Sequence, residues 1–205
     1  MKSERDIEQL LSGLRVRRRQ LLCGLVAGAL SSVVVGAWAE SPTAPIAVQA
    51  QILARILPFE RGFAAHAKDR VLIIIVERNS SPDSASAARQ MSRALSEIGK
   101  VADKPIVVRN VAFGGVGSLA RDCKESGALA LYVTPDLGAE VPALATALAG
   151  SRVLSLAAVE GYVRQGAVLG VEVVDGKPRM SINLAQAKAQ KLDFPSALLK
   201  LARIY

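Results

Sequence analysis

The stretch Arg70-Val71-Leu72-Ile73-Ile74-Ile75-Val76 is a continuous apolar run that is rich in β-branched residues. A strand that is half exposed alternates apolar and polar side chains, whereas a strand that is covered on both faces is apolar throughout. This run therefore predicts a central strand of a parallel sheet. Because such sheets are covered by helices on both faces, the run also indicates an α/β protein.

Helices and strands alternate outward from this central strand. A helix is expected over Ile46–Leu57, where apolar residues recur at helical spacing until Pro58. Ser81-Pro82-Asp83-Ser84 provides capping residues for a helix that continues to Ile98. Further strands are expected at 105–111, 128–133 and 152–156, and further helices at 117–126 and 141–149. The alternation predicts a mostly parallel sheet of about four strands flanked by helices.

The pattern changes in the last forty residues. Ala167–Val174 and Pro178–Ile182 flank Asp175-Gly176-Lys177, which is typical of a β-hairpin turn. The sheet is therefore expected to end in a C-terminal antiparallel hairpin. Two closing helices are expected at 184–190 and 195–204, the second with an apolar face formed by Leu198, Leu199, Leu201 and Ala202.

Residues 1–39 have the pattern of a signal peptide. The basic cluster Arg15–Arg19 precedes an uncharged run from Leu21 to Val35, and Ala37-Trp38-Ala39 provides a cleavage site before Glu40. Arg18-Arg19-Gln20-Leu21-Leu22 resembles a twin-arginine signal, although Arg17 and Leu21 replace the consensus Ser/Thr and Phe. The export route, general or twin-arginine, stays open, and the mature protein is expected in the periplasm.

A retained transmembrane anchor is the alternative interpretation of this segment. Leu21–Trp38 is shorter than the roughly 20 predominantly apolar residues of a comfortable span, and glycines and serines dilute it. We therefore expect cleavage and no stable membrane insertion afterwards. Residues 40–45 would then form a flexible lead-in, and residues 46–205 a single domain.

Charge and cysteine content exclude several classes of function. The net charge is +8, but the basic residues are scattered rather than gathered into the patch that nucleic-acid binding requires. No nucleic-acid partner is expected. After cleavage Cys123 would be the only thiol, since Cys23 lies in the leader, so neither an internal disulfide nor a cysteine metal cluster can form. Cys123 is interpreted as a buried apolar residue.

Gly115-Val116-Gly117-Ser118-Leu119-Ala120 has the form of a dinucleotide-binding turn, and Asp136 follows at about the spacing of the ribose-binding carboxylate. The mature chain leaves little room for a separate substrate domain, however. We interpret the segment as a tight strand-to-helix turn, and no cofactor is expected. An oxidoreductase that uses this turn remains a distant third interpretation of the chain.

Residues suited to catalysis do not form a recognisable set. His66 is the only histidine, and no Gly-x-Ser-x-Gly elbow is present. Ser81 and its neighbours Ser80, Ser84 and Ser86 suit helix capping, Glu60-Arg61 suits a local ion pair, and Asp69 and Glu77 have no spacing typical of acid–base chemistry. The sequence therefore predicts no catalytic, cofactor-binding or metal-binding residue, and no enzyme.

The C-terminal third carries a resemblance to a known family. The three segments Gly161–Val171, Gly176–Leu184 and Leu192–Ala202, together with Ile52–Phe63 ahead of the central strand, are similar to the YfiR-like family of periplasmic regulators. The resemblance spans residues 46–205. Within it, Gly166 and Gly170 fit strand positions of close approach, Asn183 fits a helix cap, and Leu198, Leu199 and Leu201 fit core packing.

This resemblance implies a regulator that binds the periplasmic domain of a membrane diguanylate cyclase and so lowers cyclic-di-GMP and biofilm formation. A sensor histidine kinase is the other partner that it leaves open. Two departures set this chain apart: a single mature cysteine cannot reproduce the redox response of some members, and Gln165 replaces one of two paired glycines. A periplasmic solute-binding module of a transport system is the alternative, and a homodimer stays open.

Overall fold

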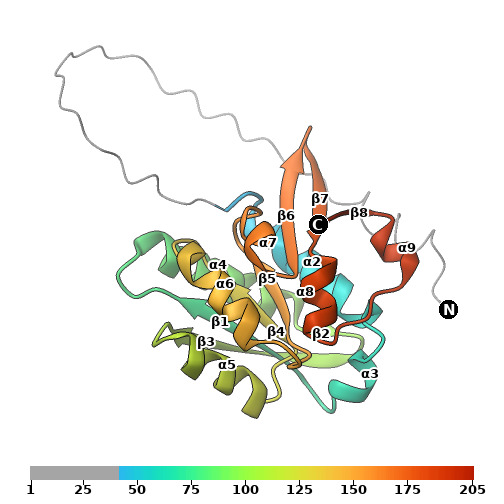
Figure 1. Ribbon diagram of the computed structural model, residues 1–205, viewed down its shortest axis with the longest axis horizontal. Helices are drawn as coiled ribbons and strands as arrows, with labels where there is room; N and C mark the ends of the chain where they lie inside the picture. Colours follow the sequence, from blue (N-terminus) through green and yellow to red (C-terminus); the bar gives the residue numbers. More distant parts are fainter. Residues whose placement is uncertain (1–41) are drawn as a thin grey trace.

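The computed structural model describes residues 42–205, which form a mixed α/β fold around one eight-stranded sheet (Figure 1). The strand order is β2-β3-β1-β4-β5-β6-β7-β8. The strands are β1 (Val71–Glu77), β2 (Lys100–Val101), β3 (Lys104–Ala112), β4 (Ala130–Val133), β5 (Leu154–Ala157), β6 (Leu169–Val174), β7 (Lys177–Ile182) and β8 (Ala202–Ile204).

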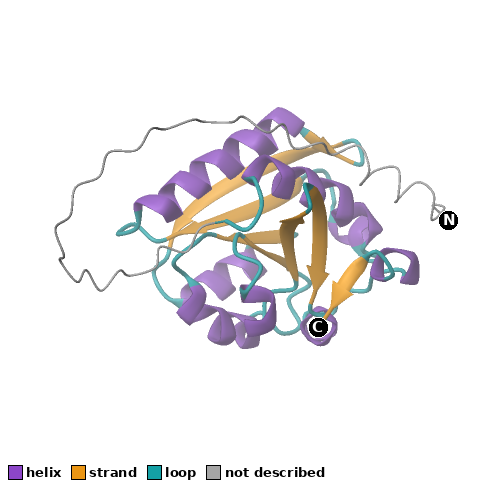
Figure 2. Cartoon of the chain, turned by 90° about the horizontal axis from the view of Figure 1, so that it is seen from above, coloured by secondary structure: helices purple, strands orange, loops and turns teal. Residues whose placement is uncertain are grey.

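Helices cover both faces of this sheet (Figure 2). They are α2 (Ile46–Ile56), α3 (Phe63–His66), α4 (Pro82–Ile98), α5 (Val116–Glu125), α6 (Val141–Ala147), α7 (Tyr162–Gln165), α8 (Leu184–Ala189) and α9 (Ser196–Leu199). One core cluster packs α2 and α4 against the sheet, and a second cluster packs α5 and α6 against the opposite face. The architecture is thus three layers.

The central strand β1 is buried on both faces, as its sequence predicts. Val71, Ile73 and Ile75 belong to the core cluster beneath α2 and α4. Leu72, Ile74 and Val76 belong to the cluster beneath α5 and α6. Each of these six side chains is at most 7% exposed. Covering both faces requires the helical layers, which is why this run determines the fold class.

The number of strands differs from the prediction. Parallel pairs join β3 to β1, β1 to β4, β4 to β5, and β5 to β6, so the parallel part of the sheet also includes the first strand of the expected hairpin. β2 and β8 bring the total to eight strands, two more than the four parallel strands and the two hairpin strands that were expected. They contain two and three residues, too few for a recognisable sequence pattern.

The C-terminal segment contains a hairpin and then a strand where a helix was expected. β6 and β7 pair antiparallel across Asp175 (φ 51°) and Gly176 (φ 73°), the two positive φ angles of a type I′ turn. The expected helix over 195–204 is wrong beyond Leu199, because Ala202–Ile204 pairs in parallel with Met180–Ile182. The apolar spacing of this segment suits both structures, and pairing with the sheet overrides its helical pattern.

Local chemistry at several element ends follows the sequence. The Ser81 hydroxyl accepts a hydrogen bond from the Ser84 N–H at 3.0 Å and caps α4, and Asn183 Oδ1 accepts one from the Gln186 N–H at 2.9 Å and caps α8. Close approach at Gly170 is confirmed, since a Cβ there would lie 2.5 Å from Val163 Cγ2. Gly166 is equally crowded, by Ala145, but it ends α7 and is not part of a strand.

Residues 42–45, the described part of the expected flexible lead-in, are bound to the body of the protein. The Thr43 hydroxyl donates to the Val171 carbonyl at 2.7 Å and accepts from the Glu160 N–H at 3.0 Å, and Ala44 is 3% exposed. The predicted signal peptide, residues 1–39, lies outside the described residues. From residue 42 onward, no helix combines the length and the apolar character that spanning a bilayer requires.

Candidate functional site

The carboxyl ends of β1 and β4 form the first candidate site. These neighbouring strands continue into helices on opposite faces of the sheet, α4 and α6, so the strand order changes direction between them. Open α/β sheets bind ligands at such a topological switch point. Six polar residues gather there, and we call them the switch-point network: Arg78, Ser81, Ser84, Thr134, Asp136 and Glu140.

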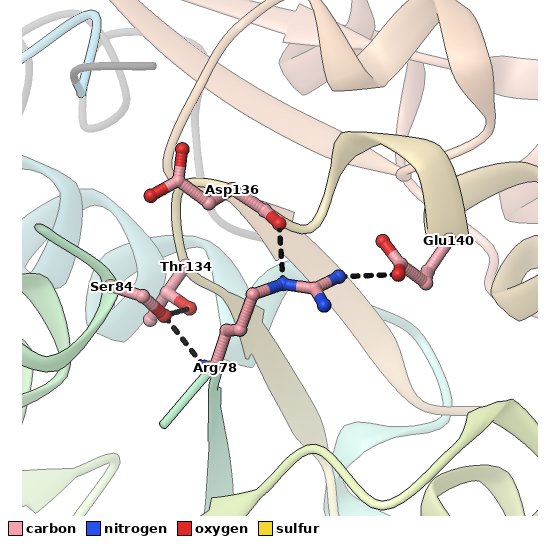
Figure 3. Close-up of polar contacts among 5 residues, drawn as sticks. All are labelled: Arg78, Ser84, Thr134, Asp136 and Glu140. Atoms are coloured by element: carbon pink, nitrogen blue, oxygen red, sulfur yellow. Dashed lines mark hydrogen bonds and ion pairs between the residues drawn. The ribbon is translucent and has the colours of Figure 1, made fainter. Parts of the chain in front are cut away.

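Hydroxyl groups link the two strand ends in a chain of hydrogen bonds (Figure 3). The Thr134 hydroxyl donates to the Val76 carbonyl at 2.7 Å, so the Ser84 hydroxyl, 2.6 Å away, donates to Thr134. The Ser84 oxygen in turn accepts the Arg78 backbone N–H at 2.8 Å. The Ser81 hydroxyl is bonded to the Asp136 carboxylate. All three hydroxyl protons are thereby held by acceptors of the chain itself.

The Arg78 guanidinium reaches from the end of β1 to the segment that follows β4. It donates to the Asp136 carbonyl at 2.8 Å and forms an ion pair with Glu140 (Figure 3). It also lies over the Phe113 ring, at 5.7 Å from the centroid. Its positive charge is therefore already neutralised by a carboxylate of the same chain. The network joins the β1 and β4 sides of the fold across the switch point, and its polar groups bind one another there.

The dinucleotide-like turn does not form a cofactor site with Asp136. Gly115 precedes α5 and has a φ of 118°, which only glycine adopts readily. The turn follows β3, whereas Asp136 follows β4, and β1 lies between these two strands. In the nucleotide-binding arrangement the turn and the carboxylate follow neighbouring strands. The geometry supports the interpretation as a strand-to-helix turn.

The other residues that the sequence singled out are dispersed. His66 ends the short helix α3 and is exposed, with Nδ1 2.6 Å from the Gly62 carbonyl oxygen. The sequence suggested an ion pair between Arg61 and Glu60, but Arg61 pairs with a different carboxylate. It forms an exposed ion pair with Asp193 at 3.0 Å, because the loop before α9 lies beside it. Within residues 42–205, no three His, Cys, Asp or Glu side chains are close enough together to hold a metal ion.

Cys123 is buried beneath α5. Its side chain belongs to the core cluster that α5 and α6 form with the sheet. Burial raises the pKa of the Cys123 thiol to about 12, and the negative charge of Asp122 adds to this effect. Because the thiolate is the reactive form of cysteine, the thiol is inert near neutral pH. This agrees with its interpretation as a buried apolar residue.

A second candidate site lies at the end of the sheet that β6, β7 and β8 form. The β6–β7 hairpin extends away from the body, with α9 and β8 beside it (Figure 1). We call residues 172–179 of this hairpin the arm. An open groove of about 710 Å³ runs between the arm and the α9–β8 segment, and we call it the arm groove. It is lined by Glu172, Val174, Pro178, Arg179, Met180, Lys200, Leu201, Ala202 and Arg203.

The charges of the arm groove are unequal. Three basic side chains, Arg179, Lys200 and Arg203, face one carboxylate, Glu172. Glu172 and Arg179 are directly opposite each other on β6 and β7, so they partly offset one another. The remaining excess is positive. A groove with this charge attracts an acidic surface and repels a basic one.

A tyrosine with two arginines stands next to this groove. The guanidinium groups of Arg164 and Arg203 lie 5.1 and 5.3 Å from the centroid of the Tyr205 ring. The Tyr205 hydroxyl donates to Glu160 at 3.0 Å, and the buried Ser181 hydroxyl donates to the same carboxylate oxygen at 2.8 Å. The hydrogen bond to Tyr205 raises the pKa of Arg164. These contacts hold the C-terminal strand and its arginines in place.

Sequence reasoning missed this second site. Arg203 occurs in a segment where a helix was expected, and pairing between β7 and β8 brings it beside the arm. The one available signal was the resemblance itself. The three C-terminal segments that carry it contain α7, the first half of β6, β7, α9 and the first residue of β8, and they supply six of the nine residues that line the groove.

Solved structures with a similar fold include binding proteins. The chain is similar to the ABC domain in complex with L-Trp from Streptococcus pneumonia, with a TM-score of 0.57 and 13% identity over 78% of this chain. It is similar to a conserved domain protein from Vibrio cholerae, with a TM-score of 0.57 and 14% identity over 78% of this chain. It is also similar to a substrate-binding protein with adhesive properties from Clostridium difficile, with a TM-score of 0.52 and 14% identity over 70% of this chain. The matches span 62%, 60% and 57% of those chains. At these identities the likeness shows the fold alone.

The comparison with protein families is more specific. No curated relative matches the chain at a significant level. The family model described as YfiR/HmsC-like matches residues 46–203, from the start of α2 into β8. This match confirms the resemblance that the sequence segments carry, and it supports a periplasmic regulator. The chain belongs to the YfiR/HmsC-like family.

Proposed function

We propose that the protein is an exported periplasmic regulator that binds the periplasmic part of a membrane signalling protein through the arm groove. The signalling protein is a diguanylate cyclase or a sensor kinase. The observation that carries this proposal is the arm with its basic groove, because the segments that mark the family supply most of its lining. The groove is open and charged, as expected for a surface that meets a protein.

The charge of the groove defines the chemistry of the partner surface. Two arginines on adjacent strands, Arg179 and Arg203, point to an acidic segment of the partner's periplasmic domain. Arginine is enriched at protein interfaces because its planar head binds carboxylates in a bidentate manner. Binding would therefore weaken as the ionic strength rises.

Co-purification from solubilised membranes of the native host tests the proposal. The full chain carries an affinity tag, and the captured proteins are identified by mass spectrometry. The double variant Arg179→Gln/Arg203→Gln removes two positive charges from the groove. The matched control, Arg121→Gln/Lys124→Gln, removes two charges from exposed positions on α5. We expect the groove variant to lower capture of one membrane cyclase or kinase about tenfold or more, and the control to capture it normally.

A second readout measures the regulation itself. If the partner is a cyclase, deleting the gene should raise cellular cyclic-di-GMP, and the control variant should restore it while the groove variant should not. Capture of a signalling protein that both variants retain equally would overturn the groove as the binding surface. Capture of permease and ATPase subunits alone would overturn the regulatory role.

A solute-binding module of a transport system is the second candidate, since the fold is shared with substrate-binding proteins. The geometry of the switch point argues against it, because Arg78 and Glu140 pair with each other where a solute would bind. A thermal-shift screen of the purified protein against amino acids and other small solutes discriminates the two. We expect no saturable stabilisation, whereas a dose-dependent rise in Tm with one solute would favour the transport role.

A further inference from the structure

The strand β3 has a long open edge. It pairs with β1 along Ile106–Ala112, but β2 covers its other side only at Lys104 and Pro105. Beyond Pro105, no strand of the described chain pairs with this side. Edge strands expose unpaired backbone groups, and natural proteins usually shorten or block them. Here the open portion continues to the end of a nine-residue strand.

The direction of the backbone groups identifies which residues are open. The Ile106 N–H points outward and donates to the Gly99 carbonyl at 2.9 Å, while the Phe113 N–H points to β1 and donates to Glu77 at 2.8 Å. Because this direction alternates along a strand, Val108, Asn110 and Ala112 share the outward direction of Ile106. Their N–H and C=O groups form a ready template for another strand.

The usual protections of an edge are missing from this portion. No proline occurs between Ile106 and Ala112, and the one charged residue, Arg109, is paired with Asp122 of α5 at 2.7 Å. Val107 is 40% exposed, one of only two large apolar side chains described as exposed. An edge with open hydrogen-bonding groups, a neutralised charge and an exposed valine is suited to association.

We propose that two copies of this chain pair through their β3 edges, antiparallel, with the two-fold axis at Asn110. In an antiparallel pair, outward-directed residues must face outward-directed residues. Placing Asn110 opposite the second copy's Asn110 pairs Val108 with Ala112 in both directions. This register uses all three open residues and stops short of Pro105, so that β2 of each copy stays in its place.

The side chains in this register are compatible with one another. On the α5 face, Val107 lies opposite the second copy's Phe113, and Arg109 lies opposite the second copy's Val111. No charged residue faces its own copy, so the pairing brings no like-charge repulsion. Such a closed, two-fold contact is the commonest form of homo-oligomer. It would join two eight-stranded sheets into one and leave both arm grooves free at its far ends.

Position-specific crosslinking tests this register. In the full chain with Cys23→Ser, Asn110→Cys would place the two thiols directly opposite each other, with Cα atoms about 5.5 Å apart. Val107→Cys is the matched control on the same strand, because the two copies of residue 107 would be six residues out of register, roughly 20 Å apart. Cys123 is buried and does not compete. A short bis-maleimide should crosslink the first variant and not the second.

Sedimentation equilibrium supplies the second measurement. The unmodified chain should be a dimer, and Asn110→Pro should be a monomer with an unchanged circular dichroism spectrum, since it removes an outward-directed N–H from the edge and, besides that, one exposed hydrogen bond from Ser92. A monomeric unmodified chain would overturn the proposal. So would a dimer that Asn110→Pro leaves intact, or equal crosslinking at positions 107 and 110.

Discussion

The two ends of the sheet solve the same structural problem in different ways. At one end, β8 is three residues long, and Pro178 removes an N–H from the part of β7 that β8 leaves uncovered. Arginines surround this end. At the other end, β3 is nine residues long and leaves outward N–H groups open beyond Pro105. A blocked and charged edge suits an unlike partner with complementary charge, while an open and nearly neutral edge suits pairing of strands.

The largest effect is expected at the base of the arm. Gly170→Ala would place a Cβ 2.5 Å from Val163 Cγ2 and 3.4 Å from the Glu160 backbone. We expect a loss of about 2–4 kcal/mol in the free energy of unfolding, because the packed core cannot make room. Urea denaturation measures it.

The control for this variant lies beside the β3 end. A Cβ at Gly117 would meet nothing within 4 Å, so Gly117→Ala in α5 should be neutral or stabilising by up to about 1 kcal/mol. Equal losses in the two variants would show that the arm base is no more tightly packed than the surface of α5.

A helix cap gives the next contrast. Asn183 caps α8 and also donates from Nδ2 to the Val163 carbonyl at 2.9 Å, so Asn183→Ala should cost about 1–2 kcal/mol. Asn183→Asp keeps the capping acceptor and should cost less. At the β3 end, Ser92 donates to Asn110 on the exposed surface, and Ser92→Ala should change stability by less than about 0.5 kcal/mol. Thermal denaturation of the three variants measures these losses. A larger loss of stability in Ser92→Ala than in Asn183→Ala would contradict the prediction.

These contrasts also show which parts of the molecule sequence reasoning reaches. The central strand, the Ser81 and Asn183 caps and the crowding at Gly170 follow from local rules, since a strand buried on both faces, a helix start and a glycine each have a characteristic sequence. The arm groove does not, because Arg203 reaches Arg179 only through the pairing of β8 with β7. The Arg61–Asp193 pair was missed for the same reason, since 132 residues separate the partners in the chain.

The buried Cys123 thiol beneath α5 should make the free energy of unfolding depend on pH. Burial raises the pKa of Cys123 from 9.0 to about 12, so the unfolded chain releases this proton at a lower pH than the folded chain does. The stabilisation is complete below pH 9 and is lost as the pH rises from 9 toward 12. Between pH 8 and pH 10 the native chain should lose about 1.4 kcal/mol more than Cys123→Ala. Identical pH profiles from urea denaturation would mean that the thiol is accessible to solvent.

Exchanging the proline between the two edges produces the smallest change in stability and the sharpest test of the comparison. Pro178→Val restores an outward N–H on the arm, and Asn110→Pro removes one from β3. Neither N–H takes part in the ladder with the inner neighbour, so at protein concentrations where every variant is monomeric both should unfold within about 0.5 kcal/mol of the native chain. Their association should nevertheless change in opposite directions, which light scattering measures: the arm variant should form larger species and the β3 variant smaller ones. If self-association followed net charge instead of open backbone groups, both variants would scatter as the native chain does, because neither substitution changes the charge.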